Sequence, residues 1–217
     1  LNPYYLNLSP YGPERIELAQ GSSIDTSGEQ VVYADNSEEG LEDYRTMVWT
    51  DGGTISLTAA TLKAQGVVLR KGASLDVSGG YVITNRSLAD AGDAGALSLF
   101  GPAVLLNGEV RGLALMGKNG GSISLHAYET EVFPNLAPGQ GLDFSFMDPL
   151  PESYQRKLWL DDNRFDGTGF GRITLKSCTD LVVYGNVSLV PSPARLFLSD
   201  EGEIENILLD NDQMSHM

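Results

Sequence analysis

Cysteine and histidine are almost missing from the chain, and their scarcity excludes several kinds of site. Cys178 is the one cysteine among 217 residues, so no disulfide can form within the chain. The two histidines, His126 and His216, are too few for a metal site built from several histidines. A Ser-His-Asp triad would have to use His126, and the Gly-x-Ser-x-Gly motif of many hydrolases is absent. We expect His126 at the outer edge of a strand and Cys178 in a bend, without a redox role.

Basic residues and long apolar runs are also scarce. Lys and Arg number 14 against 29 Asp and Glu, which gives a net charge of −15. Such a surface repels the phosphates of nucleic acids and of anionic membranes, so we expect neither as a partner. No apolar run approaches the roughly 18 residues that span a bilayer, so we expect no membrane insertion. The chain starts at Leu1 without a charged or apolar leader, and we expect it to be a fragment of a longer protein.

Glycine, by contrast, is abundant, with 25 residues, and it separates the parts of a repeated pattern. The unit is clearest at 52–80, GGTISLTAATLKAQGVVLRKGASLDVSGG, which contains the runs TISLT, GVVLR and ASLDVS. Apolar residues two apart in each run predict strands with one buried face. Glycine and small polar residues between the runs predict tight bends. Three strands and three bends in so short a stretch are typical of one turn of a parallel β-solenoid.

Copies of all three runs occur elsewhere in the same order. The opening run, Gly-x-Ile-x-Leu or a close variant, occurs at 52–57, 94–99, 120–125 and 170–175. The middle run, GVVL at 66–69, recurs as AVLL at 103–106 and LVVY at 181–184. The closing run, around Ser-(Ile/Leu)-Asp, occurs at 21–28 and 72–80, with shorter relatives at 107–112 and 185–189. Because three different runs keep their order, we attribute the pattern to a structural repeat.

We therefore predict an all-β fold, a right-handed parallel β-helix that forms a single domain over residues 1–217. Ile, Leu and Val of successive turns would stack in inward files, with each strand about 4.8 Å from its equivalents in the adjacent turns. Two stretches break the repeat and are predicted to be excursions from the rod, at 29–51 and 128–168. The first is acidic, and its residues 38–48 are compatible with a helix. The second contains four prolines and most of the phenylalanines.

The runs GSSIDTSG, GASLDVSGG and GGTISLTA resemble the repeats of filamentous-haemagglutinin-type exoproteins. The stretch 161–198, in which GFGRITL precedes GNVSL, is similar to the haemagglutinin-like C-terminal-half domain of those proteins. The resemblance covers most of the chain outside the two excursions. It implies a secreted or cell-surface adhesin of a Gram-negative bacterium, exported by two-partner secretion through an outer-membrane β-barrel partner. It further implies contact with a host-cell or glycan receptor.

Asp25 and Asp76 occupy the same place in two closing runs. Stacked carboxylates could form a Ca²⁺ site, but an aspartate at a bend also caps the backbone that follows it. The Gly-Gly-x-Gly-x-Asp repeat of calcium-binding solenoids is absent. We therefore interpret both residues as bend caps and assign no metal ligand.

The cluster that most resembles an active site comprises Asp161, Asp162 and Asp166, with Arg164 and Arg172 nearby. Two carboxyl groups at a suitable separation can act as acid and base on a polysaccharide. The Asn-Thr-Asp and Gly-His-Gly signatures of pectin-type hydrolases are absent, so we interpret the acids as a solvated turn. We predict no catalytic residue, no cofactor and no enzymatic activity. The alternative is a carbohydrate-active β-helix enzyme, a polysaccharide lyase or hydrolase.

Aromatic side chains gather in the second excursion, namely Phe133, Phe144, Phe146, Trp159 and Phe165. Such a patch could bind a sugar or a receptor, but we interpret it as the anchor of a long loop. The function predicted from the sequence is a stiff structural rod that presents its excursions for attachment to a partner. A stalk that carries a toxin is a third hypothesis, which no residue of this chain decides.

Overall fold

The structure is a computed structural model, and it describes residues 14–33, 50–60, 64–84, 87–134, 144–145, 148–187, 189, 194–198 and 204–208. Within these ranges the chain forms strands β1 to β18 and one short 3-10 helix, η2 (Glu152–Tyr154). The all-β class predicted from the sequence is therefore confirmed. In this part of the chain, no helix has the length and apolarity required to cross a membrane.

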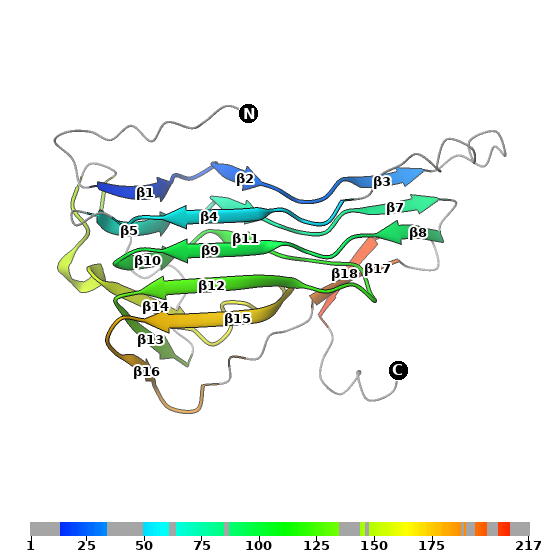
Figure 1. Cartoon of the computed structure of the whole chain (residues 1–217). Helices are drawn as coiled ribbons and strands as arrows, with labels where there is room; N and C mark the ends of the chain where they lie inside the picture. The colour runs from blue at the N-terminus through cyan, green and yellow to red at the C-terminus, as the bar shows by residue number, and fades with distance from the viewer. Residues whose placement is uncertain are drawn as a thin grey trace.

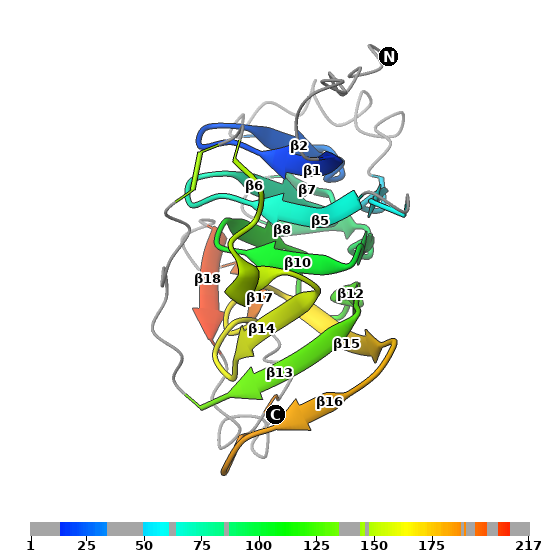
Figure 2. The ribbon, with the colours of Figure 1, turned by 90° about the vertical axis from the view of Figure 1, so that its left-hand side faces the viewer.

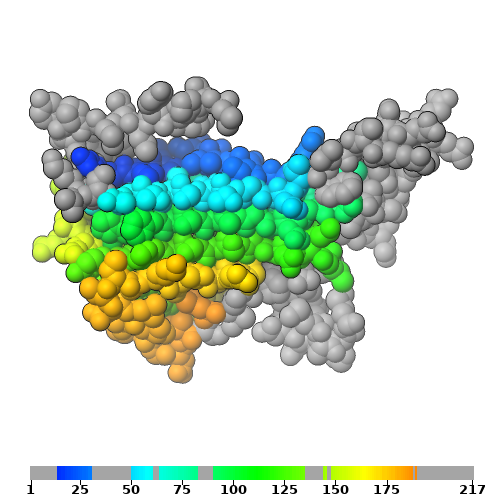
Figure 3. Space-filling model, in the orientation of Figure 1, coloured from blue at the N-terminus to red at the C-terminus, as the bar shows by residue number. Residues whose placement is uncertain are grey.

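The four opening runs form one parallel sheet of order β15-β12-β9-β4. Its strands are β4 (Thr54–Thr58), β9 (Ala96–Phe100), β12 (Gly121–Ala127) and β15 (Phe170–Ser177). They pair in register, so that Ile55, Leu97, Ile123 and Ile173 lie side by side in that order. Figures 1 and 3 show these strands as successive bands across one face of the molecule.

The middle and closing runs form two other parallel sheets. The six-stranded sheet, in the order β1-β5-β10-β14-β13-β16, contains β1 (Glu14–Leu18), β5 (Ala64–Leu69), β10 (Ala103–Leu106), β14 (Lys157–Asp161), β13 (Glu129–Phe133) and β16 (Leu181–Val183). The three-stranded sheet, in the order β11-β6-β2, contains β11 (Glu109–Arg111), β6 (Ser74–Asp76) and β2 (Ser23–Asp25). Each kind of run thus belongs to a sheet of its own.

Two further sheets contain antiparallel pairs. β7 (Tyr81–Thr84) lies parallel to β3 (Gln30–Tyr33) and antiparallel to β8 (Ser87–Ala91). β17 (Ala194–Leu198) pairs antiparallel with β18 (Ile204–Leu208). The excursion predicted over 29–51 therefore begins with a strand, β3, and the helix considered for 38–48 lies outside the described residues.

The main core consists of files of aliphatic side chains that the parallel sheets bury together. One file contains Leu57, Leu99, Leu125 and Leu175 of the opening runs. The other two sheets contribute Val67, Val104, Leu158, Leu75 and Val110 to the same cluster. Full burial of one such side chain contributes about 1.5–3 kcal/mol. The predicted burial of Ile, Leu and Val is confirmed for the residues of this cluster.

Glycines allow the backbones of adjacent strands and bends to approach closely. A Cβ atom on Gly95 would lie 1.8 Å from the carbonyl oxygen of Gly53. Gly66 in β5 has a φ of 144°, and a Cβ atom there would lie 2.1 Å from the carbonyl oxygen of Ala103. Both positions therefore require glycine, which accounts for its recurrence beside the opening and middle runs.

The excursion predicted over 128–168 is wrong at both ends, because two strands of the six-stranded sheet lie inside it. β13 and β14 pair along their whole length, and Leu158 of β14 also pairs with Val104 of β10. Although β14 follows β13 in the chain, it lies between β10 and β13 in the sheet. Of the described residues in this range, those at 144–145 and 148–156, before β14, and those of the bend at 162–168, after it, lie outside the sheets.

The described residues before β14 cover the outer face of the six-stranded sheet. We call these residues, 144–145 and 148–156, the covering segment. Its Phe144 and Leu150 pack against Val68 and Leu105, in a cluster separate from the main core. Figure 2 shows the yellow-green chain descending to β14 from the level of β1 and β5. β5 and β10 are therefore buried on both faces, and the prediction of one buried face is wrong for these two strands.

Candidate functional site

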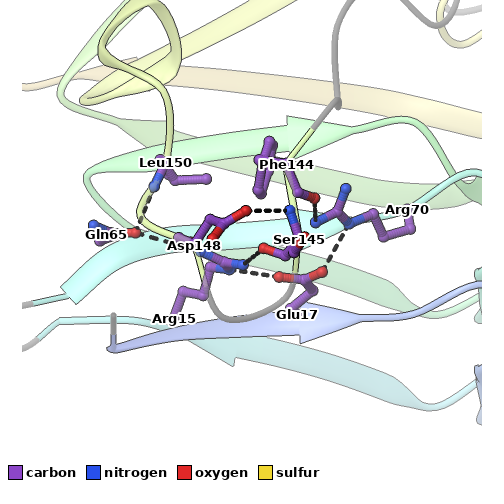
Figure 4. Close-up of polar contacts among 8 residues, drawn as sticks. All are labelled: Arg15, Glu17, Gln65, Arg70, Phe144, Ser145, Asp148 and Leu150. Carbon is purple, nitrogen blue, oxygen red and sulfur yellow. Dashed lines mark hydrogen bonds and ion pairs between the residues drawn. The ribbon is translucent and has the colours of Figure 1, made fainter. Parts of the chain in front are cut away.

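Four polar side chains under the covering segment hold it in place, as Figure 4 shows. Glu17 of β1 lies between Arg15 and Arg70 and forms an ion pair with each, at 2.7 Å for Arg70 Nε. The side chains of Arg15 and Glu17 are each only 2% exposed. Gln65 Oε1 accepts a hydrogen bond of 2.9 Å from the backbone nitrogen of Leu150. Opposite charges buried together compensate one another, whereas either charge alone would be strongly destabilising.

The two arginines then bind the backbone of the covering segment. Arg15 donates hydrogen bonds to the carbonyl oxygens of Asp148 and Ser145, the second at 3.0 Å. Arg70 Nη2 donates to the carbonyl oxygen of Phe144 at 2.8 Å. The Phe144 ring centroid lies 4.1 Å from Arg70 Cζ and 5.1 Å from Arg15 Cζ, within cation–π range. This buried cluster therefore attaches the segment to β1 and β5.

Asp25 and Asp76 cap bends, as the sequence predicts. In each, Oδ1 accepts a hydrogen bond of 2.8 Å from the backbone nitrogen two residues later, that of Ser27 or Ser78. The two aspartates are in register with each other and with Arg111 of β11, so the column contains both signs of charge. Among the described residues, no group of three or more His, Cys, Asp or Glu could hold a metal ion.

A hollow of about 480 Å³ lies beside this column. Asp25, Asp76, Tyr81, Arg111 and Leu113 are among the residues that line it. The sequence identified the two aspartates because they occupy equivalent places in a repeated run. It gave no sign of the other three, because they come from different strands and bends that only the stacking brings together.

Asp161, Asp162 and Asp166 come together in the bend between β14 and β15. Burial raises the pKa of Asp161; Arg164 and the backbone of Asn163 oppose this, while Asp162 and Asp166 add to it. Burial and repulsion from Asp162 likewise raise the pKa of Asp166. A carboxyl group with a raised pKa can act as a general acid, but these three belong to the end of β14 and the bend that follows it rather than to two facing elements.

The two arginines predicted beside these acids have different surroundings. Arg164 Nη2 donates a hydrogen bond to the carbonyl oxygen of Gly108, and burial lowers the pKa of Arg164 although Asp161 opposes this. Arg172 is exposed on β15. Phe165, within the bend, is 1% exposed and belongs to the main core. The bend is therefore a packed corner of the fold with ionisable groups at its rim.

His126 and Cys178 lie side by side, which their separation of 52 residues conceals in the sequence. Cys178 Sγ is 3.6 Å from His126 Nε2, and the His126 ring packs against Phe100 with centroids 4.6 Å apart. Cys178 is exposed in a bend, as predicted, and His126 lies near the end of β12. Among the described residues, no carboxylate hydrogen-bonds to His126, so these residues form no Ser-His-Asp triad.

The aromatic patch predicted in the second excursion does not form one surface. Phe165 is in the main core. Phe144 and Trp159 both contact the same tyrosine of η2, and Phe144 anchors the covering segment. Phe133 stacks on a ring that follows β16, and Phe146 lies outside the described residues. The interpretation as a loop anchor is therefore confirmed for Phe144.

A ladder of polar side chains that we did not predict from the sequence precedes three opening runs. Asp51 Oδ1 accepts a hydrogen bond from the backbone nitrogen of Asp93 at 2.9 Å. The two carboxylate oxygens of Asp93 accept from the backbone nitrogen and Nδ2 of Asn119, each at 2.8 Å, and these bonds lower the pKa of Asp93. The signal was present as Asp-Gly-Gly, Asp-Ala-Gly and Asn-Gly-Gly before successive strands.

A buried carboxylate joins three segments near the β16 edge of the six-stranded sheet. Glu131 of β13 is 7% exposed and accepts hydrogen bonds from Lys157 Nζ and, at 3.2 Å, from the Tyr184 hydroxyl. Burial by itself raises the pKa of Glu131, but its partners, Lys157 foremost, outweigh burial, so the pKa is lowered. The same hydrogen bond raises the pKa of Lys157.

No protein family, curated protein or solved structure matches this chain. The arrangement of the strands alone therefore defines the class of protein. The described residues form an all-β protein of stacked parallel strands, with a clamped covering segment and a polar hollow.

Proposed function

We propose that the chain is a right-handed parallel β-helix and serves as a rod segment of a secreted or surface-attached adhesin. The supporting observation is the register of the opening runs, in which four strands distant in sequence place equivalent residues side by side. The succession of opening, middle and closing strands also recurs, as β4-β5-β6 and then β9-β10-β11. In such a stack each strand is stabilised by its nearest neighbours, so the rod is stiff and can be extended.

The unpaired end of the stack supports an extended rod. Leu181 and Val183 of β16 continue the inward files, since they pair with Thr130 and Val132 of β13. Yet they are 48% and 52% exposed, and among the described strands β16 pairs with β13 alone. A further strand of the same kind stacked on β16 would cover both side chains and satisfy the strand edge.

The repeats' resemblance to filamentous-haemagglutinin-type exoproteins supports the cellular role. On this proposal the rod leaves a Gram-negative cell through an outer-membrane β-barrel partner and holds its attached segments toward a receptor. The net charge of −15 keeps such rods apart from one another and from anionic membranes.

Protease treatment of intact producing cells tests this function. An antibody against the chain should detect it in the medium or on unbroken cells, and added protease should remove the cell-bound fraction. A chain that stays protected until the cells are broken would contradict a role outside the cell.

A carbohydrate-active enzyme is the second candidate, favoured by the raised pKa values of Asp161 and Asp166. The assay is a panel of acidic and neutral polysaccharides, with and without Ca²⁺, using the wild type, Asp161→Asn and Asp166→Asn. Asp180→Asn, an exposed change elsewhere, is the matched control. Turnover that disappears only in the first two variants would establish the enzyme, and no turnover favours the rod.

A further inference from the structure

The hollow beside the closing strands is lined by a tyrosine whose hydroxyl group has no hydrogen-bond partner among the described residues. Tyr81 is 7% exposed, and its side chain lines the hollow. Burial raises the pKa of its phenol, and no described residue hydrogen-bonds to the hydroxyl group. The hydroxyl oxygen itself retains accessible surface, so it offers a donor and an acceptor to a molecule in the hollow.

The two aspartates add acceptors whose positions are fixed. Their bend-capping bonds occupy Oδ1 of Asp25 and of Asp76 and orient both carboxylates. Oδ2 of each accepts no hydrogen bond from another described residue. Because the aspartates pair across adjacent strands, the two carboxylates are about one strand spacing, ~4.8 Å, apart. Two hydroxyl groups on one small ring can therefore each donate a hydrogen bond to one of the two carboxylates.

Arg111 provides donors in the same column. Its Nη2 donates to Glu109 Oε2 at 2.7 Å, and no described residue accepts a hydrogen bond from its Nε or Nη1. Leu113 adds an apolar patch to the lining. The volume of about 480 Å³ is typical of a site for a small molecule. The carboxylates disfavour an anionic ligand, and the absence of a three-acid group in the described chain disfavours a metal ion.

We propose that this hollow binds one neutral hexopyranose unit. Sugar hydroxyls donate to the free oxygens of Asp25 and Asp76 and accept from Tyr81 and Arg111, while ring C–H groups rest on Leu113. Paired donors and acceptors around a small apolar patch match a polyhydroxylated ring better than they match an ion. The inference goes beyond the rod function. It does not depend on that function, because the described strands position the residues that line the hollow whether or not the chain serves as a rod.

Saturation-transfer NMR on the whole chain tests the site, with the methyl glycosides of mannose, galactose and glucose as probes. Asp76→Asn retains the Oδ1 bend cap but replaces the free acceptor with an amide donor. Tyr81→Phe removes only the hydroxyl group. We expect at least one glycoside to bind in the millimolar range, with affinity about tenfold lower in Asp76→Asn and about three- to tenfold lower in Tyr81→Phe. The control, Asp180→Asn, should bind like the wild type.

Circular dichroism identifies any variant that fails to fold. If Asp76→Asn fails to fold, the comparison of Tyr81→Phe with the wild type tests the proposal. The proposal is overturned if none of the three glycosides shows saturation transfer. It is also overturned if both variants bind as tightly as the wild type. Calorimetry with Ca²⁺ alone provides a further test, since Ca²⁺ binding that Asp76→Asn abolishes, without any glycoside binding, would assign the hollow to a cation.

Discussion

At the scale of single residues, the middle runs show how far a local pattern can be interpreted. Alternation predicted the opening strands correctly, and in β12 buried and half-buried residues do alternate. In β10 all four residues are buried, and AVLL contains no polar position. Such continuous apolar runs are typical of strands covered on both faces. The cover itself could not be predicted, because it comes from residues such as Leu150, 85 positions after its partner Gln65.

Val68 tests whether the outer face of β5 is a core. Val68 is fully buried, whereas Val183 is 52% exposed, so the same substitution can be compared at both sites. We expect Val68→Ala to lower the free energy of unfolding by about 1–3 kcal/mol and Val183→Ala to change it by less than about 0.5 kcal/mol. Urea denaturation measures both. Equal effects would mean that the outer face of β5 is not covered.

Glu131 makes stability depend on pH in a defined direction. Its folded-state pKa is lowered from 4.5, so its carboxylate stabilises the fold above that pH. This contribution is lost as the pH falls through the lowered, folded-state pKa. We expect Glu131→Gln to cost about 1–3 kcal/mol at neutral pH, because it weakens a charged hydrogen bond, and to cost little in strong acid.

Urea denaturation at a series of pH values measures this dependence. Glu109→Gln is the control, because the Glu109–Arg111 pair is more than half exposed and should contribute only about 0–1 kcal/mol. A loss of stability in Glu131→Gln that stayed constant across the acid range would show that the charge of Glu131 is not responsible.

At the scale of elements, the sequence predicted the strands better than their order. The existence of a strand depends on neighbouring residues, and the repeated runs became strands of their predicted kinds, except the closing run at 185–189, whose described residues form no strand. The insertion of β14 between β10 and β13 depends on the route of the covering segment. That route is fixed by contacts such as Arg15 to Asp148, which are 133 positions apart. For the same reason the bend caps at Asp25 and Asp76 were predictable, whereas the hollow beside them was not.

Phe144 tests the attachment of the covering segment. Phe144→Ala removes the ring that packs on β5 and β10 and lies against both arginines. We expect a loss of about 2–4 kcal/mol and rapid cleavage by protease within the covering segment. Phe100→Ala, on the half-buried outer side of β9, is the control and should cause neither effect to the same degree. Unchanged protease resistance in Phe144→Ala would show that another contact holds the segment.

At the scale of the whole molecule, the fold depends on one feature, the stacking of equivalent strands in register. The core files, the Asp51–Asp93–Asn119 ladder and the aspartate column all follow from it, since each joins the same position in successive strands. A rod built in this way gains stability with every added turn. The same stacking brings the residues around the hollow together.

The most direct test measures the spacing along one outward file of the opening strands. In a Cys178→Ser background, spin labels are attached to cysteines that replace Ser56 together with Ser98, Ser124 or Thr174, which are successive partners in register. Dipolar broadening in electron paramagnetic resonance should give distances that rise by about 4.8 Å from each pair to the next. Distances that do not increase in this order would contradict the stacked, in-register arrangement and the proposed rod with it.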